Sequence, residues 1–245
     1  MNIEYHKNWS GHLQQDMELK VYGHAGKPVL VFPAQGGRFY EFEDFGMVEA
    51  ASELIEAGVY QFYTVDSVDS QSWANWDAHP ADRARRHQEY DRYIMEEAVP
   101  FIRSRTSPEE MLLATGCSMG GYHSANFFFR HPDVFDSVIS ISGLYELRLF
   151  VGDFVNDDVY FNAPLLYLAN MDDPWYLDKY RRSKIVICAG RGAWEDAMLS
   201  DIAVLEQILE RKQIPAWIDR WGEDVDHDWP WWRQMLPYFL EKILD

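Results

Sequence analysis

The stretch Met111-Leu-Leu-Ala-Thr-Gly116-Cys-Ser-Met-Gly120-Gly-Tyr-His-Ser-Ala125 decides how the rest of the chain is interpreted. A short apolar run, typical of a buried strand, leads into Gly-Cys-Ser-Met-Gly and then into a helix-forming segment that ends at Arg130. A serine with a glycine two residues away on either side, between a strand and a helix, is typical of a nucleophile held in a strained turn. This turn predicts a Ser118 hydroxyl that points out of the sheet edge and a Met119 N–H that stabilises an oxyanion. The alternative is a structural turn with an idle serine.

The composition is that of a folded and strongly acidic chain. Its 245 residues include 40 acidic and 22 basic side chains, for a net charge of −18, and 47% are hydrophobic. This length and hydrophobic content favour one α/β domain over residues 1–245. The negative charge argues against nucleic acid and anionic membrane surfaces as partners, so a neutral or cationic small molecule is the expected substrate.

The cysteines and the N-terminus argue against a disulfide-rich, zinc-binding, secreted or membrane-spanning protein. Cys117 and Cys188 both lie in apolar surroundings, so the sequence predicts buried thiols and neither a disulfide framework nor a zinc site. Acidic residues between 143 and 182 lack the spacing of a calcium loop, and we expect no metal and no cofactor. The N-terminus has no apolar core of a signal peptide and the chain has no run of 18 apolar residues, which predicts a soluble cytoplasmic protein. The oligomeric state is not indicated.

Eight segments have the pattern of strands, and most are continuous apolar runs typical of parallel strands buried on both faces. They are residues 2–9, 16–22, 29–32, 60–65, 111–115, 137–141, 184–189 and 216–221. The first two alternate polar and apolar residues, which predicts an antiparallel pair at one sheet edge. Helical spacing is found over residues 46–57, 81–103, 121–130, 197–212 and 230–244. We therefore expect a mostly parallel central sheet of about eight strands with helices on both faces.

Three segments are candidates for the walls of a binding site. The loop at residues 33–37 follows a buried strand and contains Gly36, and ligands bind at the carboxyl ends of parallel strands; a plain surface loop is the alternative. The polar segment after the next strand carries Trp73 and Trp76, which either wall a substrate pocket or anchor a long loop. Residues 143–182 contain only short helical fragments and are interpreted as a lid-like insertion that roofs the site.

A serine hydroxyl needs a base beside it and an acid that orients the base. His227 follows the last strand and is the only histidine after His131, which makes it the candidate base; an ordinary loop histidine is the alternative. Glu195 and Asp196 follow the seventh strand, and adjacent side chains do not both face one imidazole. We favour Glu195 as the acid, with Asp196 as the alternative.

Three motifs resemble the putative esterase family of the α/β-hydrolase superfamily, the group of S-formylglutathione hydrolases, feruloyl esterases and mycolyltransferases. They are Gly116-Cys-Ser-Met-Gly-Gly121, Phe32-Pro-Ala-Gln-Gly-Gly37 and Asp226-His-Asp-Trp-Pro-Trp-Trp232. The resemblance covers nearly the whole chain and implies an α/β-hydrolase fold. It also implies that Ser118 is the nucleophile, that His227 is the base, and that the N–H groups of Gln35 and Met119 form the oxyanion hole.

The sequence departs from the family pattern at two places. Relatives commonly have a His-Gly pair where this chain has Pro33-Ala34, and they often place the acid about three residues after a glycine, whereas position 193 is alanine. The second departure predicts an acid loop that is longer or differently folded.

The leading hypothesis is a serine esterase that cleaves carboxylic esters or thioesters of small substrates through an acyl-enzyme on Ser118. One alternative is an acyltransferase on the same three residues, with an alcohol or sugar in place of water. Another is a non-catalytic binding module with the same scaffold, because fold alone does not fix function.

Overall fold

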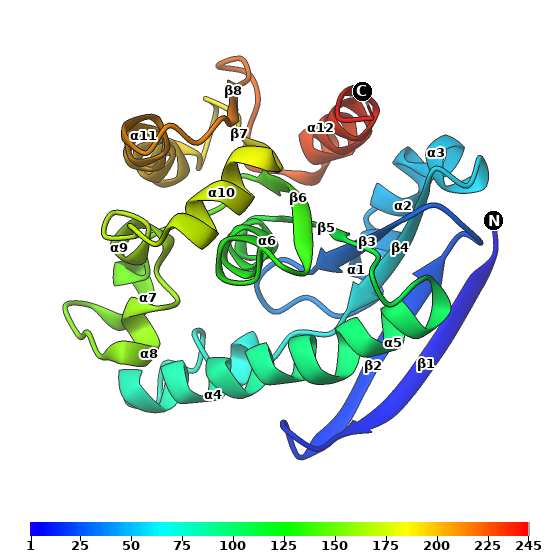
Figure 1. Cartoon of the computed structure of the whole chain (residues 1–245), viewed down its shortest axis with the longest axis horizontal. Coiled ribbons are helices and arrows are strands. Elements are labelled where there is room, and N and C mark those ends of the chain that lie inside the picture. Colours follow the sequence, from blue (N-terminus) through cyan, green and yellow to red (C-terminus); the bar gives the residue numbers. More distant parts are fainter. Residues whose placement is uncertain (245) are drawn as a thin grey trace.

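The computed structural model describes residues 1–244, and its centre is one eight-stranded sheet (Figure 1). The strands are β1 (Ile3–Ser10), β2 (Gln15–Tyr22), β3 (Lys27–Phe32), β4 (Tyr60–Val65), β5 (Leu112–Cys117), β6 (Phe135–Ile141), β7 (Lys184–Ala189) and β8 (Trp217–Arg220). Their order across the sheet is β1-β2-β4-β3-β5-β6-β7-β8. β2 is antiparallel to β1 and to β4, and every other neighbouring pair is parallel. The predicted mostly parallel sheet and its antiparallel edge pair are confirmed.

The order in which the chain visits the strands reverses direction between β3 and β5. The chain leaves β3 toward β4 on one side and leaves β5 toward β6 on the other side. The carboxyl ends of two such strands mark the switch point of an open α/β sheet, where ligands bind. The loop at residues 33–37 follows β3 and Ser118 follows β5, so the topology brings these two segments to one edge.

Helices cover both faces of the sheet (Figure 1). On one face lie α1 (Glu41–Asp44), α2 (Met47–Ala50), α3 (Ser52–Glu56) and α12 (Trp229–Lys242). On the other face lie α4 (Pro80–Tyr93), the π-helical turn η2 (Ile94–Ala98), α5 (Val99–Arg105), α6 (Met119–Arg130), α10 (Pro174–Arg182) and α11 (Asp196–Arg211). The short elements η1 (Asp69–Gln71), α7 (Arg148–Val151), α8 (Asp157–Tyr160) and α9 (Pro164–Tyr167) complete the helices. Cys117 and Cys188 are free and buried, as predicted.

Two predicted helices are less regular than expected. The helix expected over residues 46–57 is split into α2 and α3 at Ala51, whose φ is −98° and ψ is 7°. The helix expected over residues 81–103 contains the π-helical turn η2 just before Pro100. Proline has no N–H for the helical ladder and its ring crowds the carbonyl four residues earlier, so a wider turn relieves both problems. Within residues 1–244, no helix has the length and apolar character needed to cross a bilayer.

Candidate active site

Ser118 lies in the sharp turn between β5 and α6, with φ at 57° and ψ at −119°. A non-glycine residue in this region costs about 1–3 kcal/mol, so the surrounding packing must enforce it. A Cβ on Gly120 would lie 2.3 Å from the Phe32 carbonyl oxygen, and a Cβ on Gly116 would lie 2.5 Å from the Gly120 backbone. The two glycines therefore allow β3, β5 and α6 to meet. The Ser118 side chain is held at their junction and remains partly accessible to solvent.

His227 is the side chain that contacts Ser118. Its Nε2 lies 2.9 Å from Ser118 Oγ, although the two residues are 109 positions apart in the chain. The imidazole is 13% exposed and packs edge-on against the indole of Trp232, with ring centroids 4.9 Å apart. The backbone N–H of His227 donates to the Ala193 carbonyl at 2.9 Å, which ties the loop after β8 to the loop after β7. The hydrogen bond fixes the backbone of His227, and the contact with Trp232 restricts the orientation of its ring.

Glu195, and not Asp196, lies beside His227. Glu195 is fully buried and its Oε2 is 3.3 Å from His227 Nδ1, whereas Asp196 is exposed at the start of α11. The 3.3 Å contact is within ion-pair distance but is not aligned as a hydrogen bond. Such contacts are often long in a free enzyme and shorten when substrate binds. The geometry thus supports Glu195, and not Asp196, as the acid beside His227.

Ser142 orients Glu195 and was not found from the sequence. Its Oγ donates to Glu195 Oε1 at 2.6 Å and accepts from Trp232 Nε1 at 3.1 Å. The Gly190 N–H also donates to Glu195 Oε1, at 3.4 Å. Ser142 has a φ of 50°, which brings its hydroxyl toward the acid from the end of β6. No local motif marks this serine, because its role depends on two residues that lie far away in the chain.

The loop at residues 33–37 forms a tight turn beside Ser118. The Gly37 N–H donates to the Ala34 carbonyl at 2.9 Å and Gly36 has a φ of 74°, which is the pattern of a type II turn with Gln35 at its first central position. In the described part of the chain, the Gln35 N–H donates to no backbone carbonyl. The turn begins just after Phe32, whose carbonyl lies against Gly120 in the turn that contains Ser118. The two turns are therefore neighbours, and the Gln35 N–H has no backbone acceptor among the described residues.

The type II turn makes one backbone N–H removable by mutation. Proline is favoured at the first central position of such a turn, so Gln35→Pro is expected to keep the turn and delete only the donor. Loss of one oxyanion donor costs about 100-fold or more in kcat. We expect that loss for Gln35→Pro, and kcat within about threefold of wild type for Gln35→Ala, measured by p-nitrophenyl acetate hydrolysis. Equal rates for the two variants would show that this N–H takes no part.

Trp73 and Trp76 occupy different environments. Trp73 is fully buried, in a cluster with Met119 and Tyr122. Its ring anchors the loop from inside, so the expectation that it walls an open pocket is wrong for this structure. Trp76 is 56% exposed and stacks on Phe150 with ring centroids 5.7 Å apart. Of the two rings, only that of Trp76 is available to a ligand at the surface.

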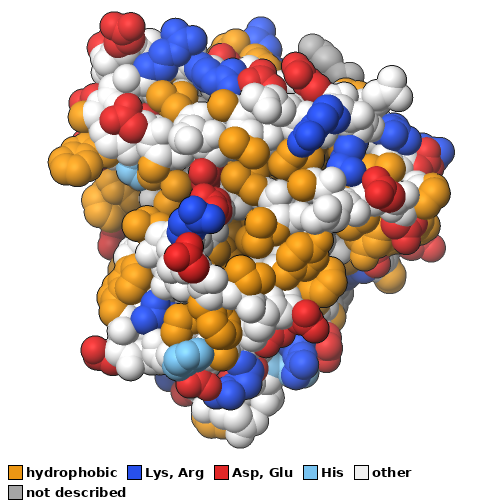
Figure 2. All heavy atoms as spheres, turned by 90° about the vertical axis from the view of Figure 1, so that its left-hand side faces the viewer, with side chains coloured by type: hydrophobic (Ala, Val, Ile, Leu, Met, Phe, Trp, Pro, Cys, Tyr) orange, Lys and Arg blue, Asp and Glu red, His pale blue; other side chains and the backbone are white. Residues whose placement is uncertain are grey.

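The segment at residues 143–182 packs against the beginning of α6. Leu147, Phe150 and Val151 belong to the same buried cluster as Met119, the residue after Ser118. The face that the segment helps to form carries scattered hydrophobic side chains (Figure 2). Within the segment, Leu149 is 67% exposed. The segment is thus adjacent to the site, with apolar groups on both its inner and outer sides.

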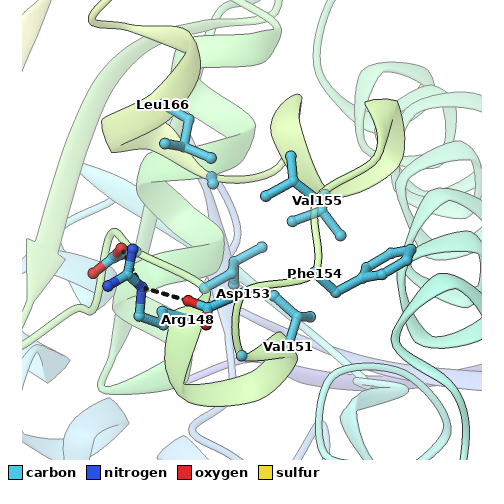
Figure 3. Close-up of a pocket in the computed structure, with 11 residues that line it drawn as sticks. Arg148, Val151, Asp153, Phe154, Val155 and Leu166 are labelled. Atoms are coloured by element: carbon cyan, nitrogen blue, oxygen red, sulfur yellow. Dashed lines mark ion pairs between the residues drawn. The ribbon is translucent and has the colours of Figure 1, made fainter.

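A small cavity of about 100 Å³ lies inside this segment (Figure 3). Its lining is mostly apolar and includes Val151 and Leu166, and an ion pair of 3.9 Å joins Arg148 Nε to Asp153 Oδ1 at its side. Ser118 does not line it. Small-molecule sites usually measure about 300 to 1,000 Å³, so this cavity alone is too small for a typical ligand.

A second histidine–carboxylate pair is sealed inside the protein. His123 Nε2 lies 2.8 Å from Asp69 Oδ1, and neither side chain is more than 1% exposed. The ring of His87 stacks on His123 with centroids 5.4 Å apart. Burial, followed by repulsion from His123, holds the pKa of His87 well below its usual value. His123 is therefore packed inside the protein against Asp69 and His87, and its ring makes no hydrogen bond to Ser118.

Glu41 is the other residue that the sequence did not reveal. This first residue of α1 is 9% exposed, and its Oε2 accepts from the Ala34 N–H at 2.7 Å. Burial raises the pKa of the Glu41 carboxyl to about 7, and the charge of Asp69 adds to the effect.

Within residues 1–244, no group of three or more His, Cys, Asp and Glu side chains is placed to hold a metal ion.

The raised pKa of Glu41 predicts a dependence of stability on pH. The folded protein binds the Glu41 proton more tightly than the unfolded chain, whose Glu pKa is 4.5, so stability is complete below pH 4.5 and is lost as pH rises to about 7. The gap corresponds to roughly 3 kcal/mol of unfolding free energy. Glu41→Gln lacks this ionisation, so its stability relative to wild type is expected to rise by up to that amount between pH 4.5 and 8. Urea unfolding at a series of pH values measures the difference, and a difference that does not change with pH would contradict the assignment.

Comparisons with known proteins agree with this architecture. A ferulic acid esterase structure superposes with a TM-score of 0.77 at 17% identity, covering 99% of this chain and 98% of the other. An S-formylglutathione hydrolase from Staphylococcus aureus gives 0.69 at 18% identity, covering 100% and 97%. The fluorophosphonate-binding serine hydrolase F of the same organism gives 0.67 at 17% identity, covering 100% and 98%. Curated protein sequences yield no significant match.

The sequence profile of the family described as Putative esterase matches residues 10–243, which is nearly the whole chain. The resemblance drawn from three short motifs is therefore confirmed, and so is the fold expected from it. The chain belongs to the putative esterase family and is a carboxylic ester hydrolase with the α/β-hydrolase fold.

Proposed function

We propose that this protein is a serine esterase that cleaves carboxylic esters or thioesters of small molecules through an acyl-enzyme on Ser118. The observation that carries the proposal is the 2.9 Å contact between Ser118 Oγ and His227 Nε2, with the buried carboxylate of Glu195 on the other side of the ring. A hydroxyl, an imidazole and a carboxylate in this row are the groups that nucleophilic acyl transfer needs.

Each side chain has one task in the reaction. His227 Nε2 removes the Ser118 proton while the serine oxygen attacks the carbonyl carbon, and the proton on Nδ1 faces Glu195. Glu195 holds that tautomer and stabilises the imidazolium that forms. The negative oxygen of the tetrahedral intermediate accepts from the N–H groups of Met119 and Gln35. His227 then gives its proton to the leaving alkoxide or thiolate, and a water molecule removes the acyl group by the same steps in reverse.

The test is the time course of p-nitrophenolate release from p-nitrophenyl acetate and butyrate. An acyl-enzyme predicts turnover, and a burst equal to the enzyme concentration where deacylation is slow. Added ethanol distinguishes the alternatives, because a transferase forms ethyl acetate in place of acetate. A folded protein that releases p-nitrophenolate no faster than its heat-denatured form would rule out the esterase.

A further inference from the structure

The carboxylate of Glu41 lies directly beneath the turn at residues 34–37. Its Oε2 accepts from the Ala34 N–H at 2.7 Å, and a Cβ built on Gly37 would lie 2.2 Å from its Oε1. The two oxygens thus contact the first and the last residue of the turn. The Glu41 N–H donates to the Arg38 carbonyl at 2.9 Å, which fixes the start of α1 immediately after the turn.

These contacts control where the Gln35 N–H points. Ala34 and Gly37 are joined by the hydrogen bond that closes the turn, so the atoms that hold its two ends also set the orientation of the peptide between them. A donor must lie within a few tenths of an ångström of its place to stabilise the transition state fully. The Glu41 side chain supplies an acceptor oxygen for the Ala34 N–H whether its carboxyl is ionised or protonated, so the contact does not require a charge.

We propose that Glu41 is the positioning residue of the oxyanion hole: its buried carboxylate clamps the turn at residues 34–37 so that the Gln35 N–H faces the developing oxyanion. This role rests on the proposed function. Glu41 acts through the turn and does not touch the substrate. Asp69 of η1 and the thiol of Cys117 on β5 are the titratable groups whose charge is coupled to Glu41 from neighbouring elements.

Three variants separate positioning from a merely structural role. Glu41→Met keeps the side-chain volume but removes the acceptor, and Gly37→Ala pushes a methyl group against the carboxylate from the opposite side. Glu41→Gln keeps an acceptor oxygen for the Ala34 N–H. We expect kcat for p-nitrophenyl acetate to fall about tenfold or more in the first two variants and to stay within about threefold of wild type in Glu41→Gln, with KM changed less than about threefold in all three.

Binding of a tetrahedral transition-state analogue gives the independent readout. The affinity for phenylboronic acid is expected to fall by the same factor as kcat in Glu41→Met and Gly37→Ala, because the analogue uses the oxyanion hole and the ground-state ester uses it less. Glu43→Gln is the matched control. Glu43 lies in the same short helix and accepts from the Tyr22 hydroxyl at 2.9 Å, away from the turn, so its kcat is expected to be unchanged.

The outcomes are distinguishable from failure of the proposed function. An inactive wild-type protein would defeat the esterase itself. An active wild type, together with a folded Glu41→Met variant of unchanged kcat and unchanged boronate affinity, would overturn only the positioning role. Circular dichroism checks folding, and if Glu41→Met does not fold, an unchanged kcat and boronate affinity in Gly37→Ala would overturn the role equally.

Discussion

Ser118→Ala is expected to lower kcat for p-nitrophenyl acetate by about 10⁴-fold or more, because it removes the hydroxyl that lies 2.9 Å from His227 Nε2. Substrate binding and the oxyanion donors remain, so a small residual rate above the uncatalysed reaction is expected. The missing hydroxyl also removes the burst, since no acyl-enzyme can form. Stopped-flow absorbance of p-nitrophenolate measures both effects.

Ser124→Ala is the matched control for this substitution. Ser124 is buried on α6, the helix that begins directly after Ser118, and its hydroxyl donates to the Gly121 carbonyl at 2.9 Å. Its loss is expected to leave kcat within about threefold of wild type, because the group makes only a local hydrogen bond. Comparable activity in wild type and Ser118→Ala would remove the basis of the proposed mechanism.

His227→Ala is expected to have the second-largest effect, a loss of about 10⁴-fold or more in kcat. Without the imidazole, the Ser118 hydroxyl keeps its proton at neutral pH and the leaving group departs without an acid. Because the two side chains act as a unit, the double variant is expected to be hardly slower than either single variant. The three values of kcat form a double-mutant cycle that measures this coupling.

His131→Ala is the control for loss of a histidine. His131 follows the last residue of α6 and contacts Asp91 at 2.9 Å, at the end of the helix opposite to Ser118. Wild-type kcat is expected for this variant.

The double-mutant cycle has its own contrary outcome. If the losses of activation free energy in the two single variants simply add in the Ser118 and His227 double variant, the two groups do not act in the same step.

The fold was predictable because local and long-range signals agree. Apolar runs and alternating patterns of strand length predicted all eight strands, and Gly116 and Gly120 predicted a turn where backbone segments approach closely. The sequence did not predict the breaks within helices, such as the π-helical turn before Pro100. The free energy of such a break depends on how the helix packs against the sheet.

The choice between adjacent acids required the folded loop. Trp194 has a φ of 68° and is 85% exposed, so the chain reverses there and turns Glu195 inward while the indole faces solvent. The same loop is tied down at position 193, where the Ala193 N–H donates to Asp226 Oδ1 at 2.7 Å. This bond, together with the one from the His227 backbone N–H to the Ala193 carbonyl, holds the loop that carries Glu195 against the loop that carries His227.

The supporting residues could not be predicted, for a common physical reason. Ser142 and Glu41 owe their contacts to burial and to partners that the sequence does not place beside them. A polar residue after a strand or at the start of a short helix is usually solvated, so nothing in its local sequence distinguishes it. Only the packed structure shows that Glu41 lies under the turn at residues 34–37, and only burial decides between the two roles that the sequence left open for Trp73.

Labelling with a fluorophosphonate, followed by peptide mass spectrometry, shows whether Ser118 is an activated nucleophile. We expect one phosphonyl group per chain, carried by Ser118, and no labelling of His227→Ala on the same time scale. A folded wild-type protein that stays unlabelled, or that carries the label on another residue, would mean that Ser118 is not activated.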